Sequence, residues 1–269
     1  MGIKSLKLKG LSAKHFSPEK KSYPYPLLFI HGMWGGKWQW DQYAQLAYDR
    51  GFECYTVDLR GHHESSADHE DLGEMSVKDH INDLKEIVGR LGRVVFIGHS
   101  MGGLIAQSLV TLSPGSRCAV FIASAAPKGI SVLSYKLATR MVNPHYIKAM
   151  WGNHAFKPLW KDARELLYNC LNNEGASAAY RGLTFESGKI ARELALSSIV
   201  VDHSLIDCPT LVVSPREDCL ISPRVQKKIA KRYGSDFLEV QGGHMIVTSE
   251  KGGNTMKAIL DWVRSRSTS

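Results

Sequence analysis

The chain has 269 residues, of which 43% are hydrophobic and 22% charged. These fractions are ordinary for globular proteins and exclude a disordered or fibrous chain. No window approaches the roughly 18 uninterrupted apolar residues that a membrane span needs, and the N-terminus carries no apolar run of the signal-peptide kind. We therefore expect a soluble protein without a membrane span.

Cysteine usage and charge bear on compartment and partners. The five cysteines are widely spaced and form no Cys-x-x-Cys pair, which favours a cytoplasmic protein over a disulfide framework or a zinc ribbon. The net charge of +8 would suit nucleic acid or anionic lipid. However, the second of two basic clusters follows a helical period, so we predict a solvated helix face and no nucleic-acid partner. The clusters are Lys4, Lys7, Lys9, Lys14, Lys20 and Lys21, and Arg224, Lys227, Lys228, Lys231 and Arg232. Either a monomer or a homodimer fits the sequence.

Short apolar runs recur along the chain. Ile3, Leu6 and Leu8 alternate with lysines, which is the pattern of a half-buried edge strand. The runs that follow have the length and apolar character of buried strands. They span residues 27–30, 54–57, 94–97, 119–122, 210–213 and 237–240.

Segments with helical period lie between these runs, at residues 40–50, 77–91, 104–112, 223–233 and 255–264. Strand and helix alternate, so we predict an α/β fold with a mostly parallel sheet and helices on both faces. The alternation breaks once, where helical segments follow one another at 135–150, 158–171 and 176–196. We predict a core made of residues 1–127 and 201–269, with residues 128–200 as a helical cap.

The segment Gly98-His99-Ser100-Met101-Gly102 directly follows one strand run and opens a helical segment. It is a Gly-x-Ser-x-Gly motif in the strand, turn and helix context of a nucleophile elbow. A serine on so sharp a turn has strained backbone angles and crowded neighbours, so flanking positions must lack a Cβ, as Gly98, Gly102 and Gly103 do. We predict that Ser100 is a catalytic nucleophile.

A serine hydroxyl is a poor nucleophile at neutral pH, so it requires a histidine base and an orienting carboxylate, in the chain order serine, acid, histidine. Asp218 lies just past the run 210–213, and His244 just past the run 237–240. Each would be a loop residue at the carboxyl end of a strand, the edge at which open α/β sheets bind ligands. We predict Asp218 as the acid and His244 as the base, with Glu217 as the rival acid.

Attack on a carbonyl produces an oxyanion, and each backbone N–H placed to receive it is worth about 3 kcal/mol in the transition state. One donor should be Met101, directly after the nucleophile. The other should come from the loop after the run 27–30, which reads His31-Gly32-Met33-Trp34-Gly35-Gly36. We predict Met33 as this donor, with Trp34 as the runner-up.

Together, these motifs resemble the α/β-hydrolase superfamily over essentially the whole chain. The resemblance rests on His31-Gly32, on Asp58-Leu59-Arg60-Gly61-His62, on the elbow, and on the acid and base in order. Within the superfamily, His31-Gly32-x-x-x-Gly36-x-Trp38-x-Trp40 and His244-Met245 are similar to the plant methylesterase and hydroxynitrile lyase branch and its bacterial esterase relatives. The resemblance implies the α/β-hydrolase fold with a helical cap.

The lyases of that branch use a lysine directly after the base histidine and a threonine in the oxyanion loop. Met245 and Met33 stand at those positions here, and neither side chain can donate a proton. The sequence therefore disfavours a lyase.

Two further patterns partly resemble a metal site and a nucleotide-binding loop. The histidine-rich segments His62-His63-Glu64 and Asp68-His69-Glu70 lack the spacing of zinc motifs, so we expect a structural or solvated loop and no metal. Gly35-Gly36-Lys37 is too short for a phosphate-binding loop. We expect no cofactor.

The expected cap is rich in aromatic and methionine side chains, which favour an apolar acyl or aromatic group over a sugar or a phosphate. They are Met141, Met150, Trp151, Phe156, Trp160 and Tyr180. Nearer to the nucleophile, we expect Trp34, His31 and His99 to contact the substrate. The sequence thus predicts a serine hydrolase that cleaves a small to medium apolar carboxylic ester through an acyl-enzyme.

Three alternatives use the same residues. The triad would also serve a thioesterase, a lactonase, a monoacylglycerol lipase or a C–C hydrolase, because the pocket decides which bond is cleaved. A second alternative is a cofactor-independent oxygenase or perhydrolase, as some relatives with this fold are. The third is a ligand receptor on a hydrolase scaffold.

Overall fold

The computed structural model describes residues 2–65, 72–249 and 251–266. Within them, an eight-stranded sheet has the strand order β1-β2-β4-β3-β5-β6-β7-β8. The strands are β1 (Gly2–Leu8), β2 (Leu11–Ser17), β3 (Leu27–Ile30), β4 (Cys54–Val57), β5 (Val95–His99), β6 (Cys118–Ile122), β7 (Thr210–Pro215) and β8 (Asp236–Val240). Strands β3 to β8 are parallel, whereas β1 and β2 are antiparallel additions at one edge. The predicted mostly parallel sheet and the edge strand β1 are confirmed.

The strand β2 was not predicted from the sequence. Its burial does not alternate, because Leu11, Ser12 and Ala13 are buried one after another. Tertiary partners decide its conformation: β2 pairs with β1 on one side and with β4 on the other, where Ala13 lies opposite Val57. Strand formation depends on such neighbours more than on intrinsic preference, so a local pattern misses it.

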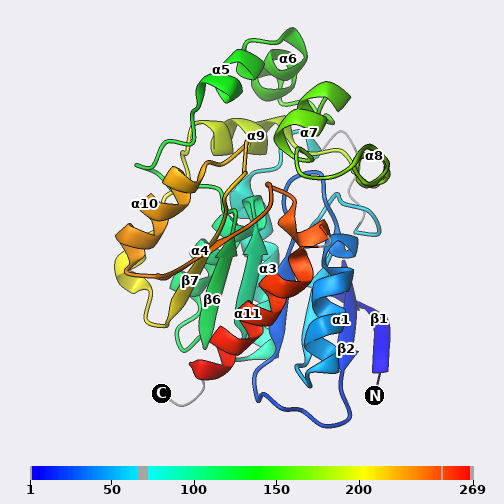
Figure 1. The fold of residues 1–269 in the computed structure, drawn as a ribbon, viewed down its shortest axis with the longest axis vertical. Coiled ribbons are helices and arrows are strands. Elements are labelled where there is room, and N and C mark those ends of the chain that lie inside the picture. Colours follow the sequence, from blue (N-terminus) through cyan, green and yellow to red (C-terminus); the bar gives the residue numbers. More distant parts are fainter. Residues whose placement is uncertain (1, 66–71, 250, 267–269) are drawn as a thin grey trace.

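Helices cover both faces of the sheet (Figure 1). On one face, α3 (Val77–Leu91), α4 (Met101–Leu112) and α10 (Pro223–Tyr233) share an apolar core with Phe96 of β5. On the other, α1 (Asp41–Asp49) and α11 (Gly252–Ser265) pack around the neighbouring Val95 and Ile97. Because successive residues of a strand point to opposite faces, strands covered on both sides show uninterrupted apolar runs.

Five α-helices of the described chain lie between β6 and β7, and we call this assembly the cap. They are α5 (Tyr135–Met141), α6 (Pro144–Gly152), α7 (Trp160–Leu166), α8 (Asn173–Arg181) and α9 (Gly188–Ala195). Figure 1 shows them gathered beyond one end of the strands, away from both chain termini. The cap thus covers one end of the strands, and not an outer strand of the sheet.

The single helices predicted at 135–150 and 176–196 are wrong, since each is divided in two. Pro144 is the first residue of α6, and the Asn143 side chain accepts the His145 N–H at 2.9 Å. A proline lacks the N–H that a continuing helix would need and is favoured at a helix start. In the second segment, the Ser187 side chain caps the new helix α9 by accepting the Ile190 N–H.

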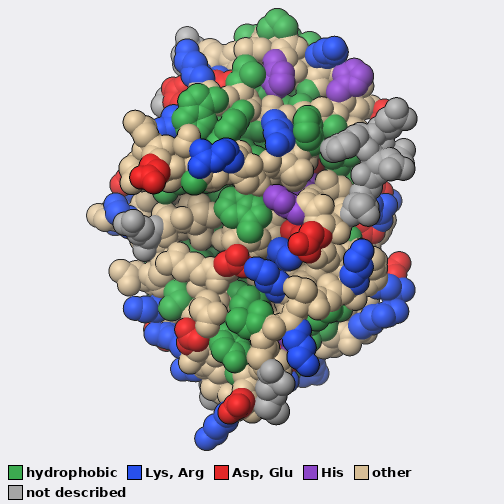
Figure 2. Space-filling view, turned by 90° about the vertical axis from the view of Figure 1, so that its right-hand side faces the viewer, with side chains coloured by type: hydrophobic (Ala, Val, Ile, Leu, Met, Phe, Trp, Pro, Cys, Tyr) green, Lys and Arg blue, Asp and Glu red, His purple; other side chains and the backbone are tan. Residues whose placement is uncertain are grey.

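The basic cluster on α10 lies on the solvent face of that helix. Lys227, Lys228 and Lys231 are exposed, while Val225 and Ile229 are buried against the sheet. On the face that Figure 2 shows, lysine and arginine side chains are spread between acidic and apolar ones.

In the part of the chain that the structure describes, no helix combines the length and apolar character needed to cross a membrane.

Candidate active site

Ser100 lies on the sharp turn between β5 and α4. Its backbone angles are φ 56° and ψ −118°, which non-glycine residues rarely adopt. Two hydrogen bonds hold this conformation: the Ser100 N–H donates to the Ile122 carbonyl at 3.0 Å, and the Ala125 N–H donates to the Ser100 carbonyl at 2.9 Å. The surrounding structure thus supports a strained backbone at the predicted elbow.

The elbow glycines leave no room for a side chain. A Cβ at Gly102 would lie 2.2 Å from the Ile30 carbonyl oxygen, and a Cβ at Gly98 would lie 2.1 Å from the Gly102 carbonyl oxygen. Both contacts involve backbone atoms, which cannot rotate aside. The glycines therefore allow β3, β5 and α4 to approach closely at this point.

We expect Gly102→Ala to lower the free energy of unfolding by about 1–3 kcal/mol or more, because the added methyl forces a backbone shift in the core. Urea denaturation measures this change. Gly89→Ala is the matched control: Gly89 lies in α3 and is exposed, with no atom within 4 Å of an added Cβ. This control should be stabilised by up to about 1 kcal/mol. Equal stability of Gly102→Ala and the wild type would contradict the close packing.

Three side chains from separate loops meet at the elbow. His244 Nε2 lies 3.0 Å from Ser100 Oγ, and His244 Nδ1 lies 2.8 Å from Asp218 Oδ2. The other Asp218 oxygen accepts the N–H groups of Leu220 at 2.9 Å and Ile221 at 2.8 Å. Ser100, His244 and Asp218 are all buried. The structure thus brings the three predicted catalytic residues into one hydrogen-bonded chain, with the histidine in the middle.

Glu217 does not reach His244. Its carboxylate accepts the Cys170 thiol at 2.9 Å, and its backbone carbonyl accepts the Asn169 side-chain amide at 2.8 Å. Burial and the Glu217 carboxylate raise the pKa of Cys170 to about 12, so this thiol stays protonated at neutral pH. Asp218, and not its neighbour, contacts the histidine.

The peptide unit between Gly32 and Met33 is held in one orientation. His31 Nε2 accepts the Leu59 N–H at 3.0 Å, so the ring proton is on Nδ1, which donates to the Gly32 carbonyl at 2.8 Å. The Gly35 N–H donates to the same carbonyl at 3.2 Å. Because a trans peptide is planar, fixing the Gly32 carbonyl also directs the Met33 N–H to the opposite side.

Two backbone N–H groups near the nucleophile are available to a ligand. Met101 is the first residue of α4, so the helix offers its N–H no acceptor. Among the described residues, the Met33 N–H makes no hydrogen bond, and a Cβ on the preceding Gly32 would lie 3.0 Å from Ser100 Cβ. The Trp34 N–H instead points to the Glu186 carboxylate, at 3.4 Å. The geometry favours Met33 over Trp34 as the partner of Met101.

A cavity of about 150 Å³ opens onto the nucleophile. Trp34 and His99 line it, but His31 does not, because its ring lies buried among the loops described above. His99 Nε2 donates to the His244 carbonyl at 2.9 Å. Burial, with a smaller effect of His244, lowers the pKa of His99 to about 3, so this ring is neutral and positions the loop of the base.

Most of the cap residues that line the cavity have apolar side chains. Of the aromatic and methionine residues expected there, Met141, Met150 and Phe156 line the cavity, whereas Trp151, Trp160 and Tyr180 do not. Gln39, which the sequence analysis missed, also lines it, and its Oε1 atom is buried without a partner among the described residues. No sequence motif predicts that Gln39 lines the cavity, because its place there depends on how the segment after β3 folds.

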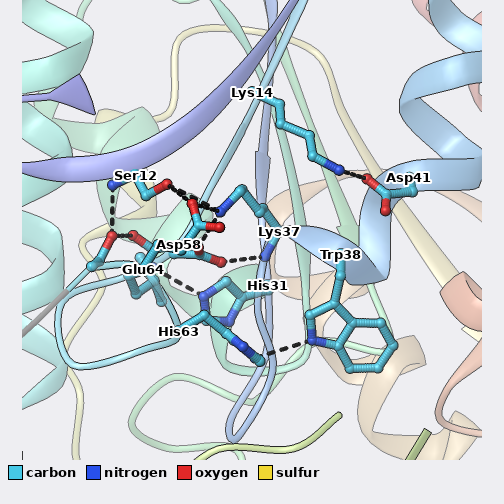
Figure 3. A network of polar contacts seen from close by, with 11 residues as sticks. Ser12, Lys14, His31, Lys37, Trp38, Asp41, Asp58, His63 and Glu64 are labelled. Carbon is cyan, nitrogen blue, oxygen red and sulfur yellow. Dashed lines mark hydrogen bonds and ion pairs between the residues drawn. The ribbon is translucent and has the colours of Figure 1, made fainter. Parts of the chain in front are cut away.

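Lys37 anchors the far end of the loop that follows β3 (Figure 3). Its Nζ lies 2.6 Å from Asp58 Oδ2 and 2.9 Å from Glu64 Oε2, and its backbone N–H donates to Asp58 Oδ1 at 2.7 Å. Burial opposes the charge on Lys37, but the two carboxylates raise its pKa above the ordinary value. Lys37 thus connects the loop after β3 to the segment after β4.

His62 is buried in the histidine-rich segment, and both of its ring nitrogens face acceptors. Nε2 lies 3.1 Å from Glu186 Oε2, and Nδ1 lies 3.0 Å from the Arg60 carbonyl oxygen. Burial disfavours the charged ring, but Glu186, the Arg60 carbonyl and Asp58 together outweigh burial and raise the pKa of His62. Asp68, His69 and Glu70 lie outside the described residues. Within the described ranges, no group of three or more His, Cys, Asp or Glu side chains is arranged to hold a metal ion.

The sequence model of the alpha/beta hydrolase family matches residues 27–251. The chain belongs to this family. The match covers the sheet from β3 onward, the elbow and the cap, so the predicted α/β-hydrolase fold is confirmed.

Solved structures of other α/β hydrolases share this fold. They include an extracellular α/β-hydrolase from a Paenibacillus species, with 20% identity, a TM-score of 0.72 and coverage of 88% of this chain and 98% of that one. The methylesterase MES16 from Arabidopsis has 18% identity and a TM-score of 0.70, and the match covers 90% and 99% of the two chains. A monoacylglycerol lipase from Paleococcus ferrophilus has 19% identity and a TM-score of 0.73, with 96% and 99% covered. The predicted resemblance to plant methylesterases and bacterial esterases is thus confirmed for the fold.

One curated relative matches part of the chain. The sn-1-specific diacylglycerol lipase ABHD11 of Danio rerio is 34% identical over 92 residues, which are 33% of this chain and 28% of that protein. The match thus spans about a third of this chain and 28% of the length of that lipase.

Proposed function

We propose that this α/β hydrolase is a serine esterase that cleaves small to medium apolar carboxylic esters. The observation that carries the proposal is the hydrogen-bonded chain of Ser100, His244 and Asp218 at an apolar cavity. In this proposal, residues 128–200 form the cap domain and shape the acyl pocket, while residues 1–127 and 201–269 form the catalytic core.

The geometry supports the following reaction. Ser100 Oγ attacks the ester carbonyl carbon while His244 Nε2 takes the hydroxyl proton, and Asp218 stabilises the imidazolium through Nδ1–H. The Met33 and Met101 N–H groups receive the oxyanion. The tetrahedral intermediate expels the alcohol, which takes the proton from His244, and an acyl-enzyme remains. Water then attacks the acyl group with His244 as the base, and the carboxylic acid and free Ser100 are released.

The names of similar proteins support an ester bond as the target. A methylesterase, a monoacylglycerol lipase and a diacylglycerol lipase all act on carboxylic esters. Met245 lines the cavity directly after the base, as Met33 does in the oxyanion loop, so the two positions at which branch lyases carry proton donors are apolar here. Both observations favour hydrolysis over lyase chemistry.

The cavity size gives a test of the acyl preference. Ala191 of α9 lines the cavity and is buried, so Ala191→Leu should fill space that a longer acyl chain needs. With p-nitrophenyl esters from acetate to palmitate, we expect kcat/KM for the longest accepted esters to fall about tenfold or more, and kcat/KM for acetate to change little.

Ala178→Leu is the matched control for this panel. Ala178 lies in α8, is exposed and does not line the cavity, so the chain-length profile should stay that of the wild type. An unchanged profile for Ala191→Leu would mean that the acyl group does not occupy the cavity under the cap.

A further inference from the structure

The cap holds Trp34 of the oxyanion loop at three atoms. The Thr184 N–H donates to the Trp34 carbonyl at 2.8 Å, the indole Nε1–H donates to the Phe156 carbonyl at 3.2 Å, and the Trp34 N–H points to Glu186 Oε2 at 3.4 Å. Phe156 and Glu186 pair with each other through two backbone hydrogen bonds of 3.0 Å. One small antiparallel bridge of the cap therefore contacts the backbone and the side chain of Trp34.

Trp34 needs this support because of its backbone conformation. Its φ of 59° lies in the left-handed region, which bulky side chains rarely adopt. Such a conformation persists only where surrounding contacts hold it. Trp34 directly follows Met33, the proposed oxyanion donor, and the two residues share a peptide unit. That unit carries the Met33 carbonyl and the Trp34 N–H, while the Met33 N–H belongs to the preceding unit, whose Gly32 carbonyl accepts hydrogen bonds from His31 and Gly35. A relaxed Trp34 would therefore rotate the unit on the C-terminal side of Met33 and strain the Met33 N–H through the Met33 Cα.

Glu186 is suited to hold this turn because its carboxylate is ionised. Burial opposes ionisation, but the nearby His62 lowers the pKa of Glu186 below its ordinary value. Besides the Trp34 N–H, its two oxygens receive His62 Nε2–H at 3.1 Å and the Ser187 N–H at 2.8 Å. An ionised carboxylate only accepts hydrogen bonds, and a charged acceptor attracts a donor strongly in a buried site, even at 3.4 Å.

We propose that Glu186 is a positioning residue of the oxyanion hole. From the cap, it holds the Trp34 turn on the C-terminal side of Met33, while His31 and Gly35 hold the Gly32 carbonyl on the N-terminal side, so that the Met33 N–H faces the oxyanion on the Ser100 adduct. His62 holds Glu186 in turn. The inference rests on the proposed serine hydrolase function. Its consequence is that the cap, in addition to the core contacts of Gly32, positions the oxyanion hole.

Glu186→Gln tests the role of the carboxylate. Three N–H donors converge on its two oxygens, so an amide must turn its NH₂ group toward at least one of them and lose that contact. We expect kcat to fall about 10- to 100-fold on the best p-nitrophenyl ester, which is less than the loss of a whole oxyanion donor costs. KM should change less than about threefold, because the interaction strengthens only in the transition state.

Glu174→Gln is the matched control. Glu174 lies in the first turn of α8 and is exposed, outside the cavity lining, so its amide variant should keep the kcat and KM of the wild type. An unchanged kcat in Glu186→Gln would overturn the inference.

Inhibitor binding separates positioning from simple packing of the cap. Ser100 Oγ adds to the boron atom of phenylboronic acid, and no group leaves. One oxygen of the tetrahedral boronate that results occupies the oxyanion hole. Benzyl alcohol occupies the cavity alone. In Glu186→Gln, we expect phenylboronic acid to bind about tenfold more weakly and benzyl alcohol to bind within about twofold of the wild type. Equal weakening of both ligands would show that Glu186 only packs the cap, and would refute the proposal.

A second variant keeps the test decisive if Glu186→Gln does not fold. His62→Gln removes the ring charge beside Glu186 and should give the same split between kcat and KM. The two proposals also fail differently. If no ester turnover depends on Ser100, the esterase function fails. If ester turnover depends on Ser100 but neither variant lowers kcat, only the role of Glu186 fails.

Discussion

Ser100→Ala should lower kcat for ester hydrolysis by at least about 10³-fold while leaving the fold intact. Among the described residues, the side-chain hydroxyl makes one hydrogen bond, to His244 at 3.0 Å, so its removal eliminates the nucleophile and little packing. Any residual turnover would come from substrate binding and the oxyanion hole alone. Steady-state assays with p-nitrophenyl esters measure the loss, and thermal unfolding checks the fold.

Ser108→Ala is a suitable control for this experiment. Ser108 lies on the same helix, α4, and is buried, but its hydroxyl donates to the Leu104 carbonyl at 3.2 Å and does not face the cavity. The control should turn over esters at the wild-type rate. Turnover by Ser100→Ala within tenfold of the wild type would refute the serine mechanism.

Asp218→Asn is the second large effect, with an expected loss of about 10³- to 10⁴-fold in kcat, as the equivalent change costs in serine proteases. Oδ1 of Asp218 accepts the N–H groups of Leu220 and Ile221. The asparagine oxygen must take that place, which turns its NH₂ group toward His244 Nδ1. His244 then carries its proton on Nε2 and cannot accept the Ser100 proton.

Glu217→Gln is the matched control for the acid. Glu217 directly precedes Asp218 but contacts Cys170 and not the histidine, so its amide variant should keep kcat within about twofold of the wild type. Steady-state kinetics of both variants on one ester decide the assignment. A loss in Glu217→Gln as large as that in Asp218→Asn would show that the acid has been assigned to the wrong carboxylate.

The parts of the fold that could be predicted have a local physical cause. Strands that helices cover on both faces carry uninterrupted apolar runs, such as Val95-Phe96-Ile97 in β5, and such a run marks them in the sequence. The elbow needs glycines because backbone atoms approach within 2.2 Å of the Cβ position at Gly102. A segment with mixed burial such as β2 has no such mark, because its conformation depends on pairing with β1 and β4.

The same distinction holds for the candidate site. Ser100, Asp218 and His244 each follow a recognisable strand, so their identity and order could be predicted before their distances were known. The expectation that His31 contacts the substrate had no such support, and the structure places its ring outside the cavity lining, in contact with Gly32 and Leu59.

Local patterns were enough to predict the parallel α/β core, the elbow at Ser100 and the candidates for acid and base, because each depends on neighbouring residues and on strand ends that meet on one side of the sheet. In contrast, the contact of Asp218 and not Glu217 with the histidine, and the contact of Glu186 with Trp34 across 152 residues of sequence, depend on tertiary packing. Contacts over such separations arise from how the cap packs on the core, and no local pattern of residue types encodes that packing.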